Sequence, residues 1–148
     1  MSASAGTVAS VLCFIASVLT LLIGLIHFVQ KVEDLEVKFS DCSFFQEDCN
    51  GGWRNVFTFR PNVFFDLWTP MVFGLLGIGL HCRFVYHKIV LNYMTYALLM
   101  IVIALFANVG YVGLCGVFTA AFSVACALVC VIVRLMGEMG IVLLDLGK

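Results

Sequence analysis

Residues 89–133 read IVLNYMTYALLMIVIALFANVGYVGLCGVFTAAFSVACALVCVIV, and these 45 residues contain no Asp, Glu, Lys, Arg or His. A helix needs about 20 apolar residues to cross the hydrocarbon core of a bilayer. The stretch is too long for one crossing and has the length of two. Its middle, ANVGYVGLCG at 107–116, holds one asparagine and three glycines, which are typical of turns. The sequence therefore predicts two membrane helices here, at 89–109 and 114–136.

Two further apolar stretches precede this one. Residues 1–30 contain no Lys, Arg, Asp or Glu, and residues 61–82 contain only Asp66. We expect membrane helices at 8–30 and 62–86, because a segment in hydrocarbon must satisfy its backbone hydrogen bonds internally. The chain is 63% hydrophobic and 11% charged, whereas about 25% of a soluble domain is charged. The predicted fold class is an all-α integral membrane protein with a single domain. It is a four-transmembrane-helix bundle with one extramembrane loop, 31–61, between the first two helices, and a short C-terminal tail at 137–148.

The charges do not decide which side of the membrane each loop faces. Four crossings place both termini on one side, and the Lys and Arg residues then divide four to each side. Since orientation follows the Lys and Arg count, this tie leaves it open. The first apolar stretch has no basic flank and exceeds the core of a signal peptide, which is about 7–15 residues long. We therefore expect it to remain as the first helix.

The loop between the first two helices contains a compact segment bounded by cysteines, DCSFFQEDCNGGW at 41–53. Cys42 and Cys49 either form a disulfide in an oxidising compartment or remain free thiols in a reducing one. The disulfide is the preferred interpretation. A disulfide implies that this loop faces the oxidising compartment outside the membrane. Both termini then lie on the opposite, inner side.

The same loop is rich in aromatic side chains. Trp and Tyr favour the membrane–water interface, which is one explanation for Trp53. Exposed apolar patches rimmed by polar groups also mark contacts with other proteins. We expect the loop to lie as a cap on the membrane surface and to contact another membrane subunit. The candidate contact residues are Phe44, Phe45, Trp53, Phe57 and Phe59.

Small residues recur along three of the predicted helices at spacings of about one or two turns. In lipid, such residues let helix backbones approach closely. They indicate packing within the four-helix bundle, with dimerisation of two chains as the alternative. They are Ser10, Ser17 and Gly24 in the first helix, Gly74 and Gly77 in the second, and Gly116 and Ala120 in the fourth.

One acidic residue falls inside a predicted membrane helix. A charge at membrane depth is a functional candidate by default, so Asp66 is the candidate for handling ions or protons. Asp66 also stands in the first turn of its helix, close to Arg60, where an acid suits the helix dipole. The sequence contains none of the common nucleotide-binding, metalloprotease or hydrolase motifs and no basic patch for nucleic acid. We expect no enzymatic activity, catalytic residue, metal or cofactor, and only structural lipids as bound molecules.

In helix number and length the layout resembles the small Golgi membrane proteins of the COPI-associated group. The Gly-Arg-Gly segment of that group is absent from this sequence, which has NVGYVG at 108–113 near the comparable place. This resemblance implies a free-standing endomembrane protein with four helices that serves vesicle trafficking.

The residues themselves favour a different function. They predict a non-catalytic accessory subunit of a larger membrane complex, whose partners are the bilayer and other membrane subunits. A small oligomeric channel or proton path that uses Asp66 is a further alternative. No asparagine starts an N-x-Ser/Thr sequon, which slightly favours the mitochondrial inner membrane over the Golgi and other endomembranes.

Overall fold

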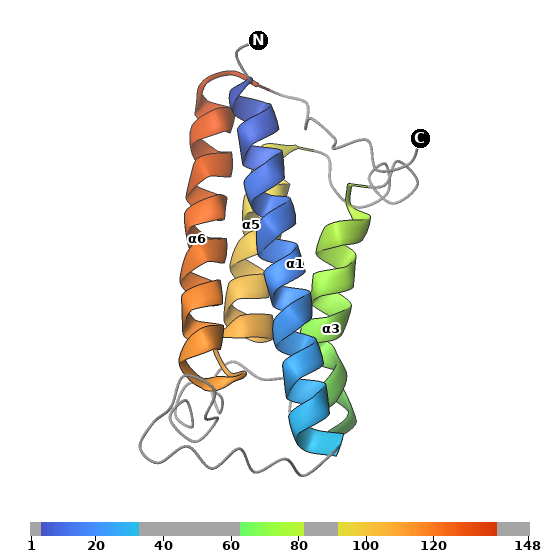
Figure 1. Ribbon diagram of the computed structural model, residues 1–148. Helices are drawn as coiled ribbons and strands as arrows, with labels where there is room; N and C mark the ends of the chain where they lie inside the picture. The colour runs from blue at the N-terminus through green and yellow to red at the C-terminus, as the bar shows by residue number, and fades with distance from the viewer. Residues whose placement is uncertain (1–3, 33–62, 82–91, 139–148) are drawn as a thin grey trace.

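The described part of the computed structural model consists of four helical rods packed side by side (Figure 1). It covers residues 4–32, 63–81 and 92–138, and the side chains of 30–32 and 63–67 are not described. The rods are α1 (Ala5–Val32), α3 (Val63–Gly79), α5 (Tyr93–Ile103) continued by the π-helix η2 (Ala104–Asn108), and α6 (Gly113–Leu135). No strand occurs within these ranges. The prediction of an all-helical chain is therefore confirmed for the described residues.

Two of the rods are long and apolar enough to cross a membrane. They are Ala5–Val29 of α1, with 25 residues, and α6, with 23 residues. At about 1.5 Å per residue, each exceeds the hydrocarbon thickness of about 30 Å. Trp68–Gly79 and Tyr93–Asn108 are shorter apolar helices. The second rod ends at Gly79 and is followed by a turn at 80–81, so it stops before the predicted end at 86.

Side-chain caps and a tight turn explain where the rods begin. The Ser4 hydroxyl accepts a hydrogen bond from the backbone N–H of Thr7 at 3.2 Å, and Asn92 caps α5 by accepting from Thr95 N–H at 2.9 Å. These side chains satisfy donors that an uncapped helix start leaves open. Between η2 and α6 the chain reverses within a few residues, and Val112 adopts φ 50° and ψ 43°.

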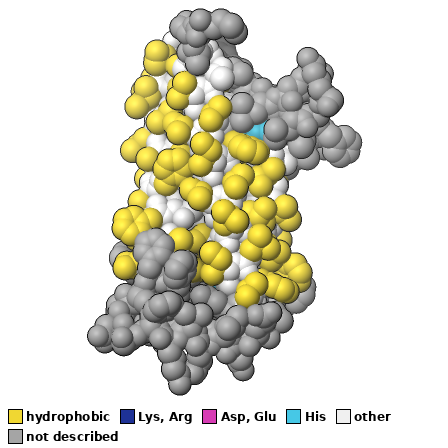
Figure 2. Space-filling model, viewed as in Figure 1, with side chains coloured by type: hydrophobic (Ala, Val, Ile, Leu, Met, Phe, Trp, Pro, Cys, Tyr) yellow, Lys and Arg dark blue, Asp and Glu magenta, His cyan; other side chains and the backbone are white. Residues whose placement is uncertain are grey.

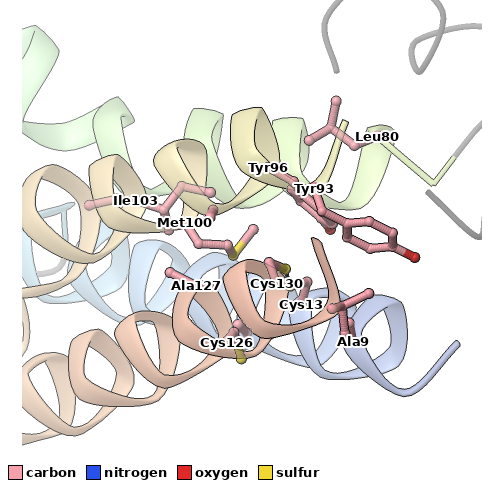
Figure 3. Packing of buried hydrophobic residues seen from close by; sticks show 14 residues of the cluster. Ala9, Cys13, Leu80, Tyr93, Tyr96, Met100, Ile103, Cys126, Ala127 and Cys130 are labelled. Carbon is pink, nitrogen blue, oxygen red and sulfur yellow. Dashed lines mark hydrogen bonds between the residues drawn. The ribbon is translucent and has the colours of Figure 1, made fainter. Parts of the chain in front are cut away.

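α1 is the central rod of the bundle. It packs most extensively against α3 and also along α6, and α6 packs against α5 (Figure 1). α3 and α5 touch each other little, and η2 fills this side by contacting both α3 and α6. The main hydrophobic core lies where α1, α5 and α6 meet, and Figure 3 shows its members. It includes Ala9, Cys13, Ala16, Tyr93, Tyr96, Met100, Ile103, Cys126 and Cys130.

Large apolar side chains cover the outer faces of the rods. Figure 2 shows hydrophobic side chains over the full height of the described surface on one face. On α5 and α6, Leu98 is 60% exposed, Phe118 62% and Leu128 61%. Water is a poor solvent for so much contiguous apolar surface. Exposed apolar surface of this kind marks contact with lipid or with other proteins.

Candidate functional site

Most of the polar side chains within the rods point into the bundle rather than outward. Asn108, the last residue of η2, is fully buried. Its Nδ2 donates to Thr20 Oγ1 of α1 at 3.1 Å and to Ser123 Oγ of α6 at 3.3 Å. One amide thus connects three rods at the middle of the bundle. Its Oδ1 accepts no hydrogen bond from the described residues.

The hydroxyl groups around Asn108 are also bonded to their own helices. Thr20 Oγ1 donates to Ala16 O at 3.0 Å, and Ser123 Oγ donates to Thr119 O at 2.9 Å. Ser17 makes the same kind of bond to Cys13 O at 2.9 Å. Hydroxyls bonded to a carbonyl one turn back are satisfied within their own helix. The protons of these three hydroxyls are therefore engaged within their own helices.

A second polar cluster lies near the N-terminal end of α1. His81, in the turn after α3, has its Nε2 2.9 Å from the hydroxyl of Tyr96 on α5. Its ring also packs edge-on against Phe14 of α1, with 5.4 Å between the ring centroids. His81 is 2% exposed, and burial lowers its pKa to about 4. The imidazole is therefore neutral at physiological pH and acts as a hydrogen-bonding partner rather than as a charge.

Three thiols lie beside this cluster, between α1 and α6 (Figure 3). Cys13 Sγ is 3.5 Å from Cys130 Sγ, and Cys126 stands one turn before Cys130 on the same helix. All three side chains are buried, and all are free thiols. A buried free cysteine behaves as a small hydrophobic side chain, and these three belong to the main hydrophobic core.

An aromatic contact occupies the other end of the bundle. The rings of His27 on α1 and Tyr111 in the turn before α6 pack edge-on, with 4.9 Å between their centroids. Both residues are buried. Ile23 and Val112 complete the small hydrophobic cluster around Tyr111. The contact holds the turn between η2 and α6 against α1.

The small residues chosen from the sequence lie at close approaches between or within the rods. A Cβ at Gly24 would lie 2.7 Å from the backbone N of Met71, and a Cβ at Gly74 would lie 2.6 Å from that of Leu21. Both contacts join α1 and α3. A Cβ at Gly77 would overlap Ser17, and one at Gly116 would overlap the carbonyl oxygens of Tyr111 and Asn108.

The three other predicted packing residues are also inside. Ser10 and Ser17 are 0% exposed, and Ala120 is 4% exposed. All of the small residues named from the sequence thus face the interior of this single chain.

The remaining predicted site residues fall outside what the structure describes. They are Cys42 and Cys49 of the predicted disulfide, the loop aromatics Phe44, Phe45, Trp53, Phe57 and Phe59, and the side chain of Asp66. The backbone of Asp66 lies in the first turn of α3. These predictions stay predictions.

Sequence reasoning missed the role of Asn108. We treated it as part of a turn, whereas it ends a π-helix and joins three rods. The available signal was a lone amide next to an apolar run, together with threonine and serine inside other apolar runs. A polar side chain at membrane depth usually has partners on neighbouring helices. That rule predicts a partner for Asn108 on another helix but does not select Thr20 and Ser123 from the other buried hydroxyl residues.

The described residues contain no cluster with the composition of a metal site. No group of three or more His, Cys, Asp or Glu side chains within 4–32, 63–81 and 92–138 is placed to hold a metal ion. The hydroxyls of Ser17, Thr20, Thr119 and Ser123 each donate to a carbonyl of their own helix. No family model, curated protein or solved structure matches this chain. Function must therefore be argued from the bundle itself.

Proposed function

We propose that this chain is an integral membrane protein with four crossings that acts as a non-catalytic accessory subunit of a larger membrane complex. The observation that carries this proposal is the division of side chains between the two sides of the rods. Small and polar side chains pack inward, while the outward side chains are large and apolar, such as Leu98, Phe118 and Leu128. Lipid tails and the helices of other subunits are the surfaces that fit such an exterior.

The polar interior supports a structural function over a conducting one. The hydroxyls of Ser17, Thr20 and Ser123 each donate to a carbonyl of their own helix. A proton path along the bundle would have to break these bonds at each step. This arrangement favours the accessory subunit over the channel alternative, whose candidate residue is Asp66.

The expected location is the mitochondrial inner membrane, ahead of the Golgi and other endomembranes. The absence of N-glycosylation sequons in the whole sequence supports it. Cell fractionation tests this part separately. Recovery in Golgi membranes would support the vesicle-trafficking alternative instead.

The deciding experiment measures the mass at which the native chain migrates. Membranes from the source cells are solubilised in a mild detergent and separated by native electrophoresis, with a harsh detergent as the control. We expect the 16.3 kDa chain to migrate with several other subunits in the mild detergent and alone in the harsh one. Migration as one or two copies in both detergents would overturn the accessory-subunit proposal.

The number of crossings is tested in sealed vesicles. One epitope tag is placed in the segment 33–62 and another in 82–91, the two segments that flank α3. We expect protease to remove only one of the two tags from intact vesicles. Removal of both, or of neither, would mean that α3 does not cross the membrane.

A further inference from the structure

The thiols of Cys13 and Cys130 meet in the core between the first and last helices (Figure 3). They are 117 positions apart in the chain, and their Sγ atoms are 3.5 Å apart. A disulfide has an S–S bond of about 2.05 Å. The two sulfurs therefore need to approach by about 1.5 Å, a shift within reach of small side-chain and helix movements.

The geometry also decides which thiols can pair. Cys126 and Cys130 are four residues apart on α6, where Cβ atoms lie about 5–6 Å apart. A disulfide needs about 3.5–4.5 Å between Cβ atoms, so these two cannot bond without distorting the helix. Cys13 must then be one partner. Its Sγ lies 3.5 Å from that of Cys130, and its thiol also interacts with that of Cys126; we choose Cys130 because of this short Sγ–Sγ distance, and Cys126 is the competing partner.

We propose that Cys13 and Cys130 form a modification site, at which a lipid-soluble two-electron oxidant of the quinone class closes an interhelical disulfide. The two S–H bonds break and one S–S bond forms. The two protons and two electrons pass to the quinone, which leaves as the quinol, so the step is balanced.

The burial of the pair determines the class of oxidant. Cys13 and Cys130 are both 0% exposed, and they lie between helices with apolar outer faces. Transfer of an ion into such surroundings is strongly unfavourable. A neutral oxidant dissolved in the bilayer can reach the α1–α6 contact during transient separation of the helices, whereas a charged reagent in water cannot.

The disulfide would link α1, the first described helix, to α6, the last one. A cross-link that closes so long a loop restricts the unfolded chain and raises stability. The oxidised form is therefore expected to unfold at a higher temperature than the reduced form. This property goes beyond the accessory-subunit proposal and rests only on the part of it that places α1 and α6 in the bilayer, so it can fail while the subunit proposal holds.

The test uses the full-length chain in lipid nanodiscs and tetramethyl benzoquinone as the oxidant. After treatment the chain is unfolded in detergent with N-ethylmaleimide, and peptides are mapped by mass spectrometry. We expect Cys13 and Cys130 to lose alkylation together and to appear in one cross-linked peptide pair. A charged, water-soluble oxidant should leave both residues open to alkylation.

Matched variants separate this pair from the other thiols. Cys13→Ala and Cys130→Ala should each abolish the cross-link, while Cys126→Ala and Cys115→Ala, which retain the pair, should still form it. Full alkylation of Cys13 and Cys130 in a quinone-treated wild-type chain that keeps its thermal transition would overturn the proposal. A cross-link from Cys13 to Cys126 would overturn it as well.

Discussion

Adding a single methyl group at Gly74 tests how closely α1 and α3 approach. A Cβ at this position would lie 2.6 Å from the backbone N of Leu21 and 2.7 Å from its Cα. Carbon atoms in good contact are about 3.5–4.0 Å apart. Backbone atoms cannot rotate away, so Gly74→Ala requires the two helices to separate by about 1 Å.

The expected change in stability is the cost of overpacking at the helix contact, reduced by the higher helix propensity of alanine. Overpacking of a tight interior costs about 1–3 kcal/mol, and separation of the helices weakens the neighbouring contacts at Gly24 and Gly77. Alanine is a better helix former than glycine by about 1 kcal/mol. We expect a net destabilisation of about 1–2 kcal/mol, which corresponds to a decrease in Tm of about 3–6 °C for a chain of this size.

The assay is thermal unfolding of the purified chain in detergent, followed by size-exclusion chromatography of what remains folded. Val72→Ile is the matched control, because it also adds one carbon to α3 but at a side chain that is 56% exposed. This control should leave Tm unchanged. A Tm for Gly74→Ala equal to or above that of the wild type would refute the close approach of α1 and α3.

Three further predictions concern other parts of the bundle. Asn108→Ala removes two interhelical hydrogen bonds, each worth about 0.6 kcal/mol in membrane proteins, so thermal unfolding should show a loss of about 1 kcal/mol; no loss would mean that the amide does not connect the rods. Because burial lowers the pKa of His81 from 6.5 to about 4, its contribution to stability should be complete above pH 6.5 and be lost as the pH falls through 4. His81→Gln should therefore flatten the dependence of Tm on pH between these values, and an unchanged slope would contradict this reasoning. Asp66→Asn should leave the proton permeability of proteoliposomes unchanged, whereas a wild-type flux that the substitution abolishes would support the channel alternative.

The sequence predicted the helical class because membrane helices need only length and apolarity. The 45-residue run at 89–133 and its glycine-containing middle correspond to α5, η2 and α6 with the turn between them. The second helix is shorter than predicted, because apolar residues can continue past the end of a helix. Gly77 and Gly79 near that end are poor helix formers.

Contacts between distant parts of the chain could not be read from the sequence. The meeting of Cys13 with Cys130, and of His81 with Tyr96, depends on how the rods are rotated about their axes. Local periodicity leaves that rotation open when nearly every residue is apolar. The π-helix η2 made the helix faces harder to predict, because its wider turn changes the direction in which the side chains up to Asn108 point.

The pattern of hydrogen bonds at the middle of the bundle has a consequence for biogenesis. The hydroxyls of Thr20 and Ser123 form hydrogen bonds that need no neighbouring helix, because each donates to a carbonyl of its own helix. On the membrane topology proposed above, α1 and α6 can therefore enter the bilayer as separate segments without exposing these protons to lipid. The amide of Asn108 finds its two acceptors only on α1 and α6. In that topology the α5–η2 rod depends on its neighbours to satisfy this amide, and α6, the last of these helices in the chain, supplies the second acceptor.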